Sequence, residues 1–166
     1  MIFCVEIKSN NIERFERLKK FVLEILPLLD QLKIKPILWG SFAYICYSKD
    51  FEMSVNDIDF LISKENYESL LKKLNEENIK YNYVEGWDCI QIIKEDIMIE
   101  FDPLEEYPID KFEEIDLGDF KLKAISLEDL KRRYKLASED KKVAAYSTEK
   151  VRSYRKKYEK LQALSK

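Results

Sequence analysis

The order in which helical and strand-like apolar patterns follow one another constrains the fold of this chain more than any single motif. The first patterns predict, in turn, a helix at 12–26, a strand at 36–39, a helix at 41–48, a strand at 57–62 and a helix at 65–78. Several strand-like segments follow, and the helical period returns only near residue 126. Because there is no regular βαβ repeat, the sequence predicts an α/β (α+β) fold. Its mixed sheet carries flanking helices and a C-terminal helical segment.

The remaining boundaries come from local signals. We expect a short strand at 2–7, and a helix that Pro27 ends or kinks near Leu26. Ser126 and Asp129 form a capping pair that begins a helix. The later ranges are strands at 80–85, 89–94 and 97–102, a hairpin at 112–115 and 119–124, and helices at 126–138 and 148–164. These expectations divide the chain into an α/β domain at 1–124 and a helical segment at 125–166 that packs on it.

The composition limits the chemistry that this chain can perform. Its 166 residues are 46% apolar, enough for one packed domain. The absence of histidine excludes imidazole-based catalytic triads and histidine-ligated zinc sites. Three widely spaced cysteines favour reduced thiols and a cytoplasmic location. We expect no membrane span and no secretory leader.

Charge is unevenly distributed along the chain. Residues 124–166 contain 13 basic and 6 acidic residues, a net charge of +7, whereas residues 1–123 carry −10. A basic C-terminal part could bind a polyanion such as nucleic acid, or it could be a solvated helical face. The sequence favours the solvated face and leaves nucleic-acid binding open.

Two apolar strand-like segments end in acidic residues with i, i+2 spacing. Asp57 and Asp59 open one segment, and Glu100 and Asp102 close another. Residues two apart in a strand point to the same face, so these carboxylates would cluster if the two strands are neighbours. Clustered carboxylates in a cleft need a cation, and oxygen ligands suit Mg²⁺ or Mn²⁺. The pattern therefore predicts a divalent metal site, although structural acidic pairs are also common.

A small-residue pair precedes the acidic segments. Gly40 allows the backbone to approach a phosphate closely, and Ser41 offers a hydroxyl group at the start of the next helix. A simple strand-to-helix turn would have the same sequence. Together with the predicted metal site, however, the pair fits phosphoryl or nucleotidyl transfer better than other chemistries.

The segment 37–102 contains, in order, Gly40-Ser41, a helix, Asp57-x-Asp59 and a later acidic strand. In this order of motifs it resembles the DNA polymerase beta-like nucleotidyltransferase superfamily. It is similar in particular to the small bacterial and archaeal members, which include antibiotic nucleotidyltransferases. The resemblance implies that Gly40 and Ser41 hold the β- and γ-phosphates of a nucleoside triphosphate. It implies that Asp57, Asp59 and Glu100 bind two divalent ions, and that a nucleoside monophosphate passes to a hydroxyl acceptor.

Two features of the chain depart from that pattern. The basic residue that often precedes the aspartates is replaced by Glu52, Met53 and Ser54. The third carboxylate could be Glu100 or Asp102, and we favour Glu100 because it lies within the strand. A non-catalytic module of the same fold, such as a toxin–antitoxin component or a nucleotide- or protein-binding domain, is the alternative.

Other candidate residues are weaker. If Ser41 were a nucleophile, it would have no imidazole base as a partner. Cys46 is expected in the core. Aromatic side chains could stack on a base, but core packing is favoured for them. These are Trp39, Tyr44, Tyr47 and Trp87. Basic residues after the capping pair might reach a triphosphate or face solvent: Lys131, Arg132, Arg133 and Lys135.

Overall fold

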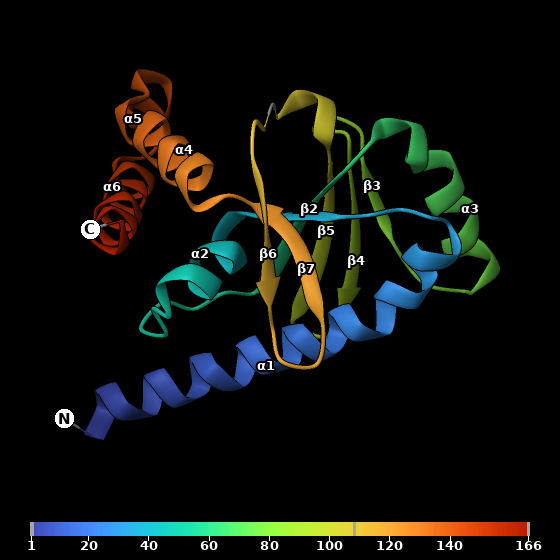
Figure 1. Cartoon of the computed structure of the whole chain (residues 1–166), viewed down its shortest axis with the longest axis horizontal. Coiled ribbons are helices and arrows are strands. Elements are labelled where there is room, and N and C mark those ends of the chain that lie inside the picture. Colours follow the sequence, from blue (N-terminus) through green and yellow to red (C-terminus); the bar gives the residue numbers. More distant parts are fainter. Residues whose placement is uncertain (1, 108, 166) are drawn as a thin grey trace.

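One mixed sheet forms the centre of the molecule. The structure, a computed structural model, describes residues 2–107 and 109–165 (Figure 1). Within these residues seven strands pair in the order β3-β4-β5-β2-β1-β7-β6. Their bounds are β1 Ile37–Trp39, β2 Asp57–Ile62, β3 Asn82–Val84, β4 Cys89–Lys94, β5 Ile97–Pro103, β6 Phe112–Asp116 and β7 Lys121–Ile125. Strand β2 is parallel to β5 and antiparallel to β1, which is parallel to β7, so the predicted mixed sheet is confirmed.

Helices flank this sheet and form a cluster at one end of it. Figure 1 shows α1 running across the sheet, α3 at the β3 side, and α4, α5 and α6 together beyond α2. The bounds are α1 Ile2–Gln31, α2 Gly40–Ser48, α3 Tyr67–Glu76, α4 Leu127–Glu139, α5 Lys141–Tyr146 and α6 Thr148–Leu164. Helix α6 packs against α4, α5 and α2. Among the described residues, no helix combines the length and apolar character needed to cross a bilayer.

Alternation along the two central strands separates an apolar face from a polar one. Ile58 and Phe60 of β2 are buried, as are Ile99 and Phe101 of β5. Ile58 pairs in register with Ile99, and Phe60 pairs with Phe101. The rings of the two phenylalanines stack with their centroids 5.8 Å apart. The acidic residues occupy the alternate positions, so they share the opposite face. Core packing of the apolar face thus determines where the carboxylates point.

The predicted strand at 2–7 is wrong, because these residues are the first turns of α1. Pro27 lies inside that helix, which continues to Gln31, so the expected end at Leu26 is also wrong. A proline removes one backbone hydrogen bond from a helix. Here Leu28 and Leu29, both buried in the core, hold the last turn in place. Tertiary packing has outweighed local propensity.

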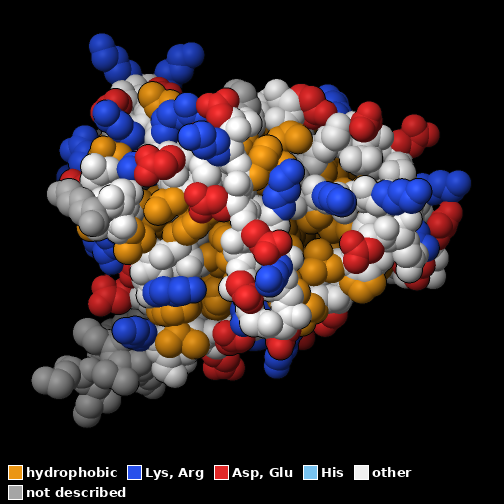
Figure 2. All heavy atoms as spheres, in the orientation of Figure 1, with side chains coloured by type: hydrophobic (Ala, Val, Ile, Leu, Met, Phe, Trp, Pro, Cys, Tyr) orange, Lys and Arg blue, Asp and Glu red, His pale blue; other side chains and the backbone are white. Residues whose placement is uncertain are grey.

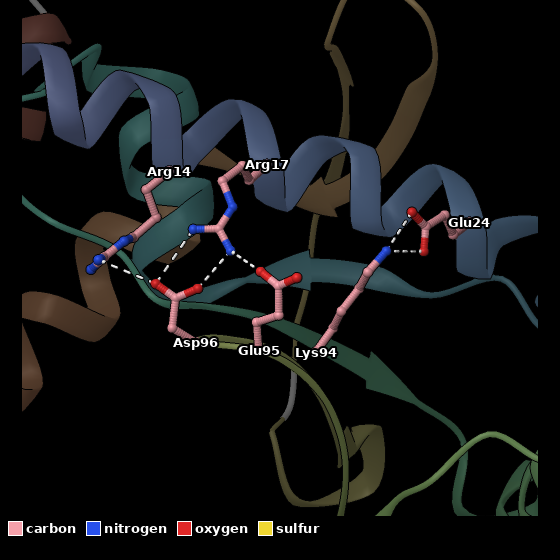
Figure 3. A network of polar contacts seen from close by, with 6 residues as sticks. All are labelled: Arg14, Arg17, Glu24, Lys94, Glu95 and Asp96. Atoms are coloured by element: carbon pink, nitrogen blue, oxygen red, sulfur yellow. Dashed lines mark hydrogen bonds and ion pairs between the residues drawn. The ribbon is translucent and has the colours of Figure 1, made fainter.

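Ion pairs join α1 to the β4–β5 hairpin. Figure 3 shows Arg17 between Glu95 and Asp96 at the turn, with the guanidinium 2.6 Å from Asp96 and 3.1 Å from Glu95. Further along the helix Lys94 contacts Glu24 at 2.7 Å. These side chains are partly open to solvent, where ion pairs contribute little stability. The apolar side chains of α1 that are buried in the core, such as Leu18 and Val22, therefore supply most of the free energy that holds the helix on the sheet.

The helices of the C-terminal segment begin at side-chain caps. Ser126 accepts a hydrogen bond from the backbone N–H of Asp129, as the sequence predicted. Ser147 caps α6 in the same way through the N–H of Lys150. The short helix α5 was missed by sequence analysis; Asp140 caps it. These caps fix the turns that direct α6 back onto α2.

Candidate active site

Acidic side chains from two adjacent strands meet on one face of the sheet. In the parallel β2–β5 pair, Asp59 is directly opposite Glu100. Asp57 and Asp102 lie two residues away along their strands and therefore face the same side. Carboxylate oxygens of Glu100 and Asp102, together with the Cys89 sulfur, lie within 4.8 Å of one another. The structure thus brings together the four acidic residues that the sequence singled out.

Burial and mutual repulsion make this group of carboxylates unfavourable without a cation. Burial raises the pKa of Asp59 well above its ordinary value, and the charges of Asp57 and Glu100 add to the effect. Burial and Glu100 also raise the pKa of Asp57. For Asp102, burial followed by the charge of Glu100 raises the pKa to about 7. A bound divalent cation would reverse these effects, because it favours the ionised forms.

A glycine corner lies directly against these carboxylates. Gly40 has a φ of +71°, in the region that favours glycine, and it begins α2. A Cβ built on Gly40 would lie 3.1 Å from the Asp59 carboxyl carbon and closer still to Oδ2. Position 40 therefore needs glycine both for its backbone angle and for space. The start of α2, with Ser41 as its second residue, faces the acidic group.

A lysine that sequence analysis missed completes this arrangement. Lys157 of α6 is 7% exposed, and its Nζ donates a hydrogen bond of 3.0 Å to the Ser41 hydroxyl. Burial lowers the pKa of Lys157, while the charges of Asp59 and Asp57 act in the opposite direction. Three aromatic rings surround the ammonium group, at 5.8, 5.2 and 5.9 Å: Tyr44, Tyr134 and Tyr154.

The sequence did contain a signal for this lysine. On α6 the side chains that face the core follow the helical period and include Tyr154, Tyr158 and Leu161. Lys157 interrupts this stripe, and a lysine is seldom buried unless it is paired. Its partner Ser41 lies 116 residues away in the chain. No local pattern could have identified that contact.

Two cavities border this centre. The strand pocket, about 460 Å³, is lined by Trp39, Asp59, Val84, Trp87, Cys89, Gln91, Glu100, Asp102 and Tyr107. The α6 pocket, about 380 Å³, is lined by Tyr44, Asp50, Glu52, Met53, Glu149, Arg152, Ser153, Lys156, Lys157 and Lys160. Figure 2 shows Lys and Arg side chains over the α4–α6 region, on the left of the view. Asp59, Glu100 and Asp102 therefore face the strand pocket, and Lys157 faces the more basic one.

Other candidates from the sequence have different surroundings. Arg132 is paired with Asp110 and Asp129, and Arg133 stacks 5.4 Å from the rings of Trp39 and Tyr107. The prediction of core packing is confirmed for Tyr44 and Cys46, which are both buried. For Trp87 this prediction is wrong, because the side chain is 77% exposed.

Comparison with known proteins identifies the fold. No protein-family model and no curated protein matches the chain. Among solved structures, the lincomycin-bound lincosamide antibiotic adenylyltransferase LnuA is 18% identical, with a TM-score of 0.59 over 87% of this chain and 96% of that one. The antibiotic-resistance factor ANT(2'')-Ia is 15% identical, with a TM-score of 0.60 over 87% of each chain. A nucleotidyltransferase-like protein from Paracoccidioides brasiliensis is 16% identical, with a TM-score of 0.67 over 90% and 77%.

The chain has the nucleotidyltransferase fold. The resemblance to the DNA polymerase beta-like superfamily, drawn from Gly40-Ser41 and Asp57-x-Asp59, is confirmed at the level of fold. The roles of individual residues in this nucleotidyltransferase fold remain predictions.

The contact between Gly40 and Asp59 can be tested with a matched pair of glycines. Gly118 also has a positive φ, +91°, but a Cβ there would meet open space. Gly118→Ala should therefore cost only the backbone strain, about 1 kcal/mol. Gly40→Ala should cost about 1–3 kcal/mol more, because Asp59 must move. Urea unfolding measures both. Mn²⁺ binding by paramagnetic resonance should weaken only in Gly40→Ala; equal effects of the two substitutions would contradict the assignment.

The raised pKa of Asp102 predicts a pH dependence of stability. Between the ordinary value of 3.8 and about 7, the folded protein holds a proton on Asp102 that the unfolded chain has lost. The contribution of Asp102 to the free energy of unfolding is therefore greatest at low pH, and it declines as the pH rises through that window. Relative to Asp102→Asn, the cation-free wild type should lose stability from about pH 4 to about pH 7. Unfolding titrations of both proteins at a series of pH values measure this difference in stability. A wild type that gains stability relative to Asp102→Asn as the pH rises would contradict the prediction.

Proposed function

We propose that this protein is a Mg²⁺- or Mn²⁺-dependent nucleotidyltransferase that transfers a nucleoside monophosphate from a nucleoside triphosphate to a hydroxyl acceptor. The observation that carries the proposal is the pairing of Asp59 with Glu100 on adjacent parallel strands, against the glycine corner at Gly40. Support also comes from the fold, which the chain shares with antibiotic adenylyltransferases.

The acidic group provides the donors that a hard divalent cation prefers. Asp57, Asp59 and Glu100 would hold the cations, and Asp102 is a further oxygen donor. The raised pKa values of Asp57 and Asp59 support the fit, because a cation would relieve their repulsion. When bound, such ions would supply positive charge to the entering and leaving oxygens of an in-line displacement. The carboxylates themselves would orient these ions and supply fixed negative charge.

Binding of the triphosphate falls to the glycine corner and to α6. The backbone of Gly40 and the first amides of α2 can approach phosphate oxygens without steric hindrance from a side chain. Ser41 and Lys157 offer a hydroxyl group and an ammonium group at the same place. We therefore propose that residues 125–166 act as a helical segment on the α/β domain 1–124, and that they complete the nucleotide site through Lys157.

The acceptor would enter from the strand pocket, opposite Lys157. Its hydroxyl oxygen would form a bond to the α-phosphorus while the bond from that phosphorus to pyrophosphate breaks. The acceptor's proton would leave to the carboxylate side, where Glu100 and Asp102 line the pocket. No imidazole is needed for this step, which agrees with a chain that contains no histidine.

Known complexes of proteins with this fold support a small-molecule acceptor. LnuA has been solved with lincomycin, and ANT(2'')-Ia with adenylyl-2''-tobramycin. A cytoplasmic location is supported by Cys46 and Cys89, which are buried free thiols among the described side chains.

Loss of either aspartate should abolish binding of the metal–nucleotide complex. In calorimetry the wild type should bind Mg²⁺ with a nucleoside triphosphate, whereas Asp57→Ala and Asp59→Ala should not. Asp30→Ala, at an exposed position of α1, is the control and should bind normally. Nucleotide at 100 times its dissociation constant should stabilise the wild type by about 2.7 kcal/mol in thermal unfolding. Equal affinity in all four proteins would refute the proposed site. No stabilisation of the wild type by any Mn²⁺–nucleotide would instead favour the non-catalytic module.

Lys157→Met should weaken nucleotide binding without unfolding the protein. Methionine has a similar length, and it is compatible with the surrounding tyrosines because it is apolar. The loss of one charge at the triphosphate should raise the dissociation constant for Mg²⁺–nucleotide about tenfold, equivalent to roughly 1.4 kcal/mol. Lys135→Met, on the exposed face of α4, should leave it unchanged. Unchanged affinity in a folded Lys157→Met protein would exclude Lys157 from the nucleotide site.

A further inference from the structure

A buried tyrosine hydroxyl near Ser41 has no partner in the protein. Tyr134 of α4 is 7% exposed, and its hydroxyl forms no hydrogen bond with any residue that the structure describes. A buried donor without an acceptor lowers the stability of a folded protein, and such groups are rare. The surroundings of this hydroxyl indicate what its acceptor is.

The neighbours of Tyr134 place its hydroxyl at the proposed triphosphate site. The Nζ of Lys157 lies 5.2 Å from the centre of the tyrosine ring. Burial raises the pKa of Tyr134, the charge of Asp59 adds to the effect, and the Ser41 hydroxyl acts in the opposite direction. Groups that perturb a pKa in these ways lie close to it. The Tyr134 hydroxyl therefore lies near both the start of α2 and the carboxylate face.

The ring of Tyr134 is held in place by other aromatic side chains. It stacks on Tyr154 of α6 with the centroids 6.0 Å apart, and it meets the ring of Tyr44 of α2 edge-on at 6.0 Å. The same three rings surround Lys157. Contacts from two other helices thus fix the position of the hydroxyl oxygen, so little ordering is needed when a ligand binds.

The hydrogen-bonding groups around this hydroxyl are donors. Because burial raises its pKa, Tyr134 keeps its proton at neutral pH and can donate it. The Ser41 hydroxyl already accepts a hydrogen bond from Lys157, so its own proton can be donated as well. Two hydroxyl groups and an ammonium group beside the first turn of α2 suit a phosphate group, whose anionic oxygens accept several hydrogen bonds.

We propose that the Tyr134 hydroxyl donates a hydrogen bond to a phosphate oxygen of the triphosphate, beside Ser41 and Lys157, and so positions the phosphate chain. The inference rests on the proposed function, because it adds a binding residue to the same nucleotide site. The hydroxyl has no acceptor in the free protein and gains one in the complex. Tyr134 therefore lowers the stability of the free protein while it strengthens the binding of the ligand.

Tyr134→Phe removes the hydroxyl and keeps the ring, so it should change stability and affinity in opposite directions. The variant should unfold at a temperature about 2–4 °C higher than the wild type, because an unpartnered buried donor is lost. In calorimetry its dissociation constant for Mg²⁺–nucleotide should rise about tenfold, because a hydrogen bond to a charged oxygen is lost. Mg²⁺–tripolyphosphate, which has no base and no ribose, should bind more weakly by the same factor.

Tyr47→Phe is the matched control on α2. The Tyr47 hydroxyl lies 2.8 Å from the backbone oxygen of Ile125 and 2.8 Å from the Glu113 carboxylate, so it has acceptors within the protein. Its removal should lower the unfolding temperature and leave the affinity for nucleotide and for tripolyphosphate unchanged. A residue with a purely structural role would behave like Tyr47.

The outcomes separate this inference from the proposed function. Unchanged affinity for both ligands in a folded Tyr134→Phe protein would overturn the inference while the proposed function stands. A lower unfolding temperature with unchanged affinity, expected if the hydroxyl held a buried water molecule, would overturn it too. Tripolyphosphate binding that depends on Tyr134, without any binding of nucleotide, would refute the proposed function alone. A wild type that binds neither ligand would refute both.

Discussion

The parallel, in-register pairing of β2 with β5 is the constraint on which the rest of this structure depends. It places Asp59 opposite Glu100 and buries Phe60 against Phe101 on the other face. The same alternation that builds the core therefore concentrates negative charge at one place. Burial, and then the charge of the neighbouring carboxylates, raises the pKa values of Asp57 and Asp59, and a cation bound at this face would relieve both effects. Stability and function are in opposition here, as is common at active sites.

A second long-range contact links the C-terminal helices to this face. Lys157 reaches Ser41, and one turn further along α6 Lys160 pairs with Asp50 at 2.9 Å. Asp50 also accepts a hydrogen bond from Tyr44, whose ring lies against Lys157. Basic residues of α6 are thus held beside the start and the end of α2. The charge asymmetry of the sequence, a basic C-terminal part and an acidic body, places opposite charges on the two sides of the proposed nucleotide site.

The sequence predicted the parts of this structure that are recorded in local patterns. Strand β2 and strand β4 have the predicted bounds, and the acidic pairs at i, i+2 spacing indicated a shared face. The first turns of α1 were misassigned because packing of a long helix overrode a short β-like pattern. Lys157 was not recognised for a different reason. Its significance arises from Ser41, a neighbour that is distant in the chain.

The central claim is that the carboxylates on β2 and β5 hold a divalent cation next to a triphosphate. The most direct measurement is crystallography with Mn²⁺ and a non-hydrolysable nucleoside triphosphate analogue, using the anomalous signal of manganese. The account predicts anomalous peaks bounded by Asp57, Asp59 and Glu100, with phosphate oxygens near Ser41 and Lys157. Analogue bound elsewhere, or manganese that does not contact these carboxylates, would contradict it.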